Sequence, residues 1–129
     1  MPRRSIRTAP IAILSSLGLL ASSLPSYAGE ALRVRCEQRA DRSVVSVDAK
    51  DLPDGSYSAE IVSGMNSRIA PAQAAVAGEV EFDFSSKPED ITAGAASIAR
   101  NFVQGPTTGK ILDAEGYVVV SDTVPCKVR

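Results

Sequence analysis

The sequence predicts an all-β protein, an antiparallel β-sandwich of about seven strands. Three observations support this fold class. Apolar and polar residues alternate with a period of two along several short segments, which is typical of half-buried strands. Turn-forming residues recur roughly every 8–12 residues along the chain. No segment carries the sustained periodicity of a long amphipathic helix.

Four segments in the first two thirds of the chain show this alternation clearly. In the last of them, Val80, Phe82 and Phe84 fall on one face and three acidic residues fall on the other. A proline, two aspartates and a glycine between the second and third segments predict a turn there. The four segments are LRVRCEQ (32–38), SVVSVDAK (43–50), YSAEIVS (57–63) and EVEFDF (79–84).

The stretch between the third and fourth segments is harder to interpret. We expect SGMNSRIAP, residues 63–71, to be a loop that exposes the apolar residues Met65 and Ile69. The following stretch, residues 70–78, fits either a short strand or a turn and a half of helix with Gly78 as its cap.

Residues 86–103 combine helical and extended signals. Ser86 and Glu89 have the spacing of a capping box, and apolar residues recur at helical spacing. Gly94 argues against a long helix, because glycine costs about 1 kcal/mol in a helix interior. We therefore expect one short helical turn at 88–92 followed by a strand near 97–104.

The last part of the chain predicts a hairpin and a final strand. The hairpin joins residues 110–113 to 117–121 through a three-residue loop that ends in a glycine. GPTTGK, residues 105–110, lacks the spacing of a phosphate-binding loop and is expected to be a turn. TVPCKVR, residues 123–129, is expected to be the last strand, with Pro125 at an edge or a bulge.

The first 28 residues have the pattern of a secretory signal peptide. Three arginines precede a short apolar stretch, and small residues precede a cleavage site between Ala28 and Gly29. A membrane anchor is the alternative, but the stretch is shorter than the roughly 20 apolar residues that a span needs. We expect cleavage to leave residues 29–129 as a single domain that is periplasmic or secreted, by the general or the twin-arginine route.

The two cysteines, Cys36 and Cys126, are expected to form a disulfide. An exported chain meets an oxidising compartment, where paired cysteines normally bond. The bond would close a loop of about 90 residues and contribute roughly 4–5 kcal/mol in the chain-entropy model. It also requires the first and last elements to lie side by side. A metal site is disfavoured, because the sequence contains no histidine.

The spacing of the strands and the DLPDGSY turn (51–57) between two of them are similar to those of immunoglobulin-like and fibronectin type III-like modules of bacterial exported proteins. The resemblance extends over residues 32–128. It implies an immunoglobulin-like sandwich, but it transfers no functional residue, because the tryptophan of antibody domains is absent.

The residues that could carry chemistry exclude catalytic schemes that require an imidazole. Without histidine, triads and imidazole metal centres are impossible. Asp48, Asp51 and Asp54 cluster near one turn, which fits either a solvated turn or a weak calcium site. A second cluster of acidic residues is expected on a solvent face or opposite basic residues of a neighbouring strand. It consists of Glu79, Glu81 and Asp83.

We therefore expect a non-enzymatic exported module, without cofactors, that binds a protein or cell-envelope partner through a sheet edge or a loop. The edge near Pro125 and the 63–71 loop are the candidate contacts. A fimbrial or adhesin-type assembly subunit is the alternative, and an enzyme or small-molecule carrier is a third class. With the signal removed, acids exceed bases and no basic tract remains, so neither nucleic acid nor a membrane surface is an expected partner. A monomer is expected.

Overall fold

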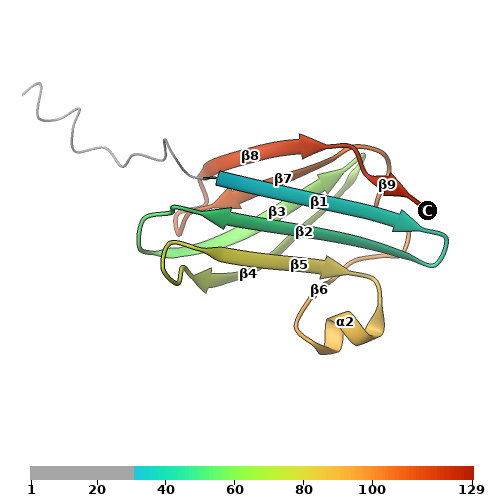
Figure 1. The fold of residues 1–129 in the computed structure, drawn as a ribbon, viewed down its shortest axis with the longest axis horizontal. Helices are drawn as coiled ribbons and strands as arrows, with labels where there is room; N and C mark the ends of the chain where they lie inside the picture. The colour runs from blue at the N-terminus through green and yellow to red at the C-terminus, as the bar shows by residue number, and fades with distance from the viewer. Residues whose placement is uncertain (1–30) are drawn as a thin grey trace, which may run out of the picture.

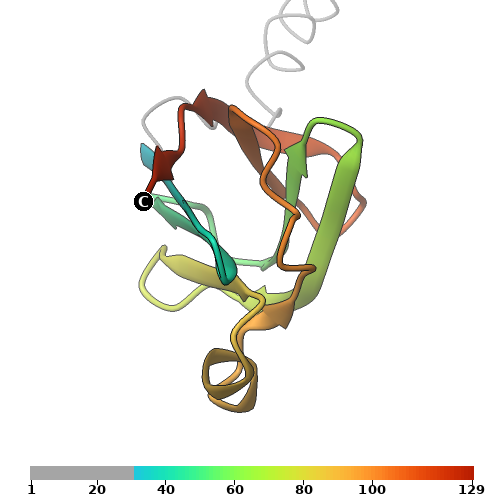
Figure 2. The same cartoon turned by 90° about the vertical axis from the view of Figure 1, so that its right-hand side faces the viewer.

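The computed structural model describes residues 31–129, which form two β-sheets packed face to face (Figures 1 and 2). The predicted signal peptide, 1–28, and its cleavage site at Ala28 and Gly29 lie outside the described residues. The first sheet has the order β6-β5-β2-β1-β9 and contains β1 (Ala31–Arg39), β2 (Arg42–Lys50), β5 (Val80–Ser85), β6 (Ala96–Ser97) and β9 (Lys127–Val128). The second has the order β4-β3-β7-β8 and contains β3 (Ser56–Ser63), β4 (Asn66–Ala74), β7 (Thr107–Leu112) and β8 (Val118–Val124).

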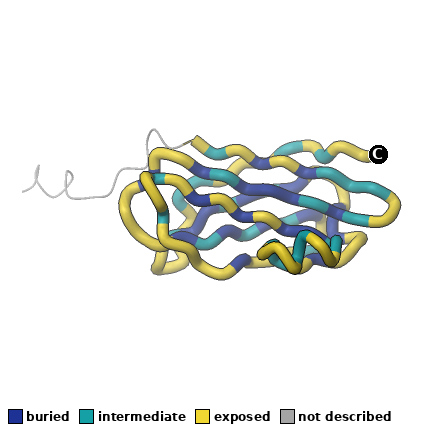
Figure 3. Tube along the Cα trace, turned by 60° about the horizontal axis from the view of Figure 1, so that its bottom comes forward, coloured by how far each residue is buried: buried dark blue, intermediate teal, exposed yellow. Residues whose placement is uncertain are grey.

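The core lies between the sheets, and the two-residue alternation of the sequence builds it. Figure 3 shows buried positions alternating with more exposed ones along the strands, whereas most turn positions are exposed. The predicted segments 32–38, 43–50, 57–63 and 79–84 coincide with β1, β2, β3 and β5 to within a few residues. The largest fully buried apolar side chains are Phe82, Phe84, Ile61, Ile111, Val45, Val47 and Val103. The all-β prediction is therefore confirmed.

The interpretation of residues 63–71 as a loop is wrong. Gly64 has a φ of 58°, which lets the chain reverse in two residues, and Asn66–Ala74 then forms β4. Met65 is at the tip of this hairpin, but Ile69 belongs to the strand. The alternation is hidden because β4 is an edge strand on which only Ala70 is buried. The helical alternative for 70–78 is also wrong.

The helical turn at 88–92 is confirmed as α2 (Pro88–Thr92). The capping box is not formed, because the residue before the helix is Lys87 and no side chain caps it. The predicted strand at 97–104 is wrong except at its start. Only Ala96 and Ser97 pair with β5, in parallel. The chain then continues as an irregular segment over residues 98–106, which crosses from one sheet to the other.

The predicted hairpin at the end of the chain is confirmed, with Gly116 at a φ of 89° in its loop. β7 begins earlier than expected, at Thr107, so that only the start of GPTTGK is a turn. The single strand expected over 123–129 is wrong. β8 ends at Val124 in one sheet and β9 begins at Lys127 in the other, because the chain leaves the first ladder at Pro125, which has no N–H to donate.

Gly109 packs tightly against the opposite sheet and gives a test of the packing. A Cβ atom added at this residue of β7 would lie 2.8 Å from Cγ2 of Val34 and 3.1 Å from Cγ2 of Val47, on the opposite sheet. We predict that Gly109→Ala lowers the free energy of unfolding by about 1–3 kcal/mol through overpacking. The exposed control Ser121→Ala should change it by less than about 0.5 kcal/mol. Equal denaturant midpoints for the two variants would contradict this packing.

Candidate functional site

A disulfide joins Cys36 of β1 to Cys126, as predicted. The two Cα atoms are 4.6 Å apart and the two residues are separated by 90 positions in the sequence. Cys36 occupies an inward position and is buried, whereas Cys126 is half-buried. The first and last strands therefore lie side by side, and β1 pairs with β9 in parallel through Glu37 and Gln38.

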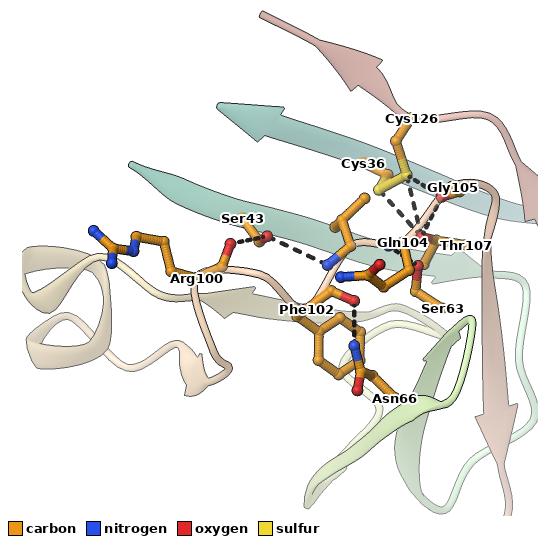
Figure 4. Close-up of a disulfide and its surroundings, with 11 residues drawn as sticks. Cys36, Ser43, Ser63, Asn66, Arg100, Phe102, Gln104, Gly105, Thr107 and Cys126 are labelled. Carbon is orange, nitrogen blue, oxygen red and sulfur yellow. Dashed lines mark hydrogen bonds between the residues drawn. A yellow bond between two sulfur atoms is a disulfide. The ribbon is translucent and has the colours of Figure 1, made fainter. Parts of the chain in front are cut away.

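A buried hydroxyl lies directly against this bond (Figure 4). The Thr107 side chain, at the start of β7, is fully buried, and its Oγ1 is 3.1 Å from Sγ of Cys126 and 3.4 Å from Sγ of Cys36. Because disulfide sulfurs carry no hydrogen, any hydrogen bond to them uses the single hydroxyl hydrogen of Thr107, which points to one acceptor at a time. The same hydroxyl is 3.3 Å from the carbonyl oxygen of Gly105. Thr107 thus connects the disulfide to the irregular crossover.

Two more buried hydroxyls and one amide hold the irregular segment 98–106 at this end of the sandwich (Figure 4). Ser43 Oγ donates to the carbonyl oxygen of Arg100 at 2.7 Å and accepts from the N–H of Val103. Ser63 Oγ accepts from the N–H of Gln104 at 2.7 Å. Asn66 Nδ2 donates to the carbonyl oxygen of Phe102 at 2.8 Å. The segment has almost no ladder partners, so these side chains take their place.

Sequence reasoning missed these anchors, although the alternation contains the signal. Ser43 has the same inward parity as Val45 and Val47, and Ser63 has the same parity as Ala59 and Ile61. A hydroxyl at an inward position close to the end of a strand indicates a backbone group that needs a partner there.

The chain after β8, residues 125–129, forms a short strap across the outer edge of β1, at the right of Figure 1. It comprises Pro125, Cys126, β9 and Arg129, and all but Cys126 are exposed. The backbone N–H of Arg129 donates to the carbonyl oxygen of Gln38 at 2.9 Å. Apart from the disulfide, the strap therefore has few contacts.

Glu37 of β1 supplies the main polar contact of the strap. Its carboxylate binds the guanidinium of Arg129 and, at 3.2 Å, that of Arg39. The hydrogen bond from Arg129, followed by that from Arg39, lowers the pKa of Glu37 below its ordinary value of 4.5. The ionised carboxylate is thus the form that fastens the strap.

A groove of about 570 Å³ opens beside the disulfide. Its walls come from β1, β2, β5, the end of β8 and the strap. We call it the disulfide groove, and its lining includes Val34, Cys36, Val44, Val124, Pro125 and Lys127. Lys127 has no ion pair within residues 31–129. This volume is within the range of ligand pockets. The lining, however, mixes apolar and charged side chains, and it offers no group of hydrogen-bond donors that point to one position.

On the side of the sandwich where β4 lies next to β5 and β6, side-chain hydrogen bonds link the edges of the two sheets. Arg68 of β4 donates through Nε to the carbonyl oxygen of Ser97 at 2.9 Å, and Gln73 Nε2 donates to that of Glu81 at 3.0 Å. Pro71 lies where the register of β3 and β4 shifts. A proline, a bulge and an arginine on the core-facing side are three devices that block strand addition.

The edge formed by β8 has less protection. Within the described residues β8 pairs only with β7, and it contains no proline. Its sequence, VVVSDTV, is rich in strand-forming residues, and Val118 is 52 % exposed. The one charged side chain, Asp122, accepts from the N–H of Thr123 at 2.9 Å, which indicates that this N–H is on the free edge. The neighbouring stretch of β1, 31–36, likewise has no outer partner among residues 31–129.

The acidic groupings do not form a metal centre in residues 31–129, where no three potential ligands gather in a suitable arrangement. Asp48 faces outward from β2 and pairs with Arg35 at 3.2 Å, while Asp51 and Asp54 are exposed in the following turn. Glu81 and Asp83 of β5 and Glu79 just before it are exposed, as expected of a solvent face. None of them forms an ion pair with Arg33, Arg35 or Lys127.

Comparison of the chain with protein-family models, curated proteins and solved structures gave no match. Among the described residues, no helix has the length and apolar character needed to cross a bilayer. The function has to be inferred from the geometry of the chain itself.

The disulfide gives the first prediction for this site. Replacing both cysteines in Cys36→Ser/Cys126→Ser should lower the free energy of unfolding by about 4–5 kcal/mol, because the unfolded chain regains the freedom of a long loop. Denaturant titration of oxidised, reduced and doubly substituted protein measures the effect. Coinciding midpoints for oxidised and reduced protein would refute it. Each single variant should form disulfide-linked dimers.

Glu37 gives a prediction about pH. Its pKa is lowered in the folded protein, so the stability that it supplies is fully present above pH 4.5 and is lost as the pH falls through the lowered value. Wild-type protein should therefore be more stable than Glu37→Gln at neutral pH, and the difference should vanish in acid. Carboxyl NMR titration should show the pKa of Glu37 rising in Arg129→Ala. An unchanged pKa of Glu37 in Arg129→Ala would contradict the contact between these two residues.

Proposed function

We propose that the protein is a non-enzymatic exported module that binds an extended segment of a protein partner along the free edge of β8. The observation that carries this proposal is a valine-rich edge strand that has far less protection against pairing than β4 has. An exposed edge presents a row of N–H and C=O groups, and a partner strand satisfies them by adding to the sheet.

The contrast between the two ends of the four-stranded sheet supports this choice of surface. β4 is blocked by Pro71, by a register shift and by the hydrogen bonds of Arg68 and Gln73. β8 has only a register irregularity at its start, near Val118, and the capping carboxylate of Asp122. A chain that protects one edge and leaves the other open directs association to the open edge. The hairpin tip with the exposed Met65 is then a solvated turn.

The environment of β8 favours a peptide over a small molecule. In the part of the chain that the structure describes, the adjoining stretch of β1 also lacks an outer partner, and the disulfide groove begins where β8 ends, at Val124 and Pro125. Backbone pairing provides affinity, and side-chain contacts in a groove beside the strand provide selectivity. With five aromatic residues after residue 28, an enclosed aromatic-lined pocket for a small ligand is a weaker alternative.

We also propose that the sandwich is of the immunoglobulin-like type. The order β1-β2-β5 corresponds to strands A, B and E of one immunoglobulin sheet, and β4-β3-β7-β8 corresponds to C′, C, F and G of the other. On this correspondence β8 is strand G, and the strap is an extension that returns to strand A. Export is supported by the disulfide together with the pattern of residues 1–28.

A proline at Ser121 tests the proposed function. Ser121 is two residues from Thr123, so its N–H points to the same free edge, and Ser121→Pro removes this donor without breaking a bond to β7. The side chain is exposed. We predict that Ser121→Pro keeps the wild-type fold but retains less than about a tenth of the partner that wild-type protein captures from an envelope extract. Ser121→Ala, which keeps the donor, should capture it normally.

A second pair of variants tests the same edge in case Ser121→Pro does not fold. Asp122→Lys places a lysine on the edge, a device that blocks strand addition, whereas Asp122→Asn keeps the size of the side chain. Binding of the purified partner should be lost in the first and kept in the second. Equal binding by all folded variants would refute the β8 edge as the site. If sedimentation shows that the protein associates with its own copies through this edge, the result would favour the assembly-subunit function over binding of a different partner.

A further inference from the structure

We infer that the Cys36–Cys126 disulfide is a redox-operated latch: it holds the strap over β1, and its reduction releases the strap while the sandwich stays folded. This inference goes beyond the proposed function and does not depend on a partner. Three observations support it. The strap has few contacts besides the disulfide, a reductant can reach the sulfur atoms, and the ladders of the other strands do not include the strap.

The strap has little to hold it in place besides the covalent bond. Its strand, β9, pairs with only two residues of β1. Val128 is 77 % exposed, and Pro125, Lys127 and Arg129 are also exposed. The ion pair between Arg129 and Glu37 lies at the surface, where water and salt weaken it. Such a short segment without a buried apolar side chain of its own frays readily.

The bond itself is open to a reductant. Cys36 contributes to the wall of the disulfide groove, and Cys126 is half-buried. The groove is lined by the carboxylates of Glu37 and Asp83 as well as by cations. Lys127, however, directly follows Cys126 and has no ion pair within residues 31–129, and a cation next to a cysteine favours its thiolate. Thr107, whose hydroxyl lies 3.1 Å from Sγ of Cys126, can donate to that thiolate. A dithiol is therefore able to reach the bond and to displace a stabilised leaving group.

The exchange balances without any further reactant. One thiolate of a dithiol attacks a sulfur of the disulfide, so that a mixed disulfide forms and the other cysteine leaves as a thiolate. The second thiol of the reductant then attacks the mixed disulfide and releases the first cysteine. The two cysteines gain two electrons and two protons, and the dithiol leaves as its own disulfide.

The hydrogen-bond ladders of the other strands do not include the strap, so the sandwich can stay folded, although less stable, when the strap is released. β1 remains paired with β2 over its whole length, from Ala31–Lys50 to Arg39–Arg42. The crossover remains attached through Ser43 and Ser63. Release of the strap therefore uncovers the outer edge of β1 from end to end and removes the link that closes the seam between β1 and β8. Oxidation closes the seam again.

NMR relaxation of the folded protein before and after reduction by dithiothreitol tests the latch. The order parameters of the Lys127 and Val128 amides should fall from about 0.85 to below about 0.6, whereas those of Phe82 and Phe84 should stay near 0.85. Reoxidation should restore the first spectrum. Oxidised Glu37→Gln is the control, and its strap should stay ordered because the disulfide is intact.

The variant Cys36→Ser/Cys126→Ser repeats the test without a reductant and should show the same mobile strap. A strap that stays rigid in the reduced protein would overturn the latch, and so would unfolding of the whole reduced chain under native conditions. In either case the disulfide would be a structural staple only. Neither outcome affects binding at β8, which is measured on oxidised protein.

Discussion

The structure depends on the contact of β1 with the chain that leaves β8, fixed by a sulfur–sulfur bond. This contact is needed because the interior is modest: of the few aromatic side chains, Phe82, Phe84, Phe102 and Tyr57 are buried, and much of the remaining core is valine, alanine and isoleucine. A domain of this size buries a smaller share of its surface than a larger one, so a covalent link that restricts the unfolded chain has a large effect on stability. The bond lies where the chain passes from one sheet to the other, between β8 and β9.

The end of the sandwich that carries the disulfide is built mainly from polar contacts. Thr107 lies against the sulfurs, and Ser43 and Ser63 supply the hydrogen bonds that a missing strand would have supplied. These hydroxyls have no access to water, so each needs its backbone partner to offset the loss of hydration. The irregular crossover is consequently fixed in position, although it lacks regular secondary structure. The opposite end of the sandwich has ordinary turns with exposed aspartates.

Local patterns predicted the strands that are buried on one face. Val45 and Val47, or Phe82 and Phe84, face one core at a spacing of two residues, and this spacing is visible without knowledge of the neighbours. The same reasoning failed for β4, where only Ala70 is buried, because an edge strand exposed on both faces has no alternation to read. It also failed for residues 98–104, whose conformation depends on hydroxyls that are distant in the sequence. For the candidate site, the cysteine pairing followed from composition and compartment, whereas the groove, the strap and the open edge of β8 depend on the tertiary arrangement.

The two open edges, on β8 and on β1, are next to the same seam, and the strap spans this seam at one end only. Protection of an edge usually takes the form of a permanent device such as a proline or a bulge, as in β4. The end of the β1 edge, at Glu37 and Gln38, is covered instead by a short segment that one covalent bond holds in place. A permanent device cannot respond to the surroundings, but this attachment responds to redox state. The same five residues therefore stabilise the sandwich when the bond is formed and control access to the β1 edge when it is broken.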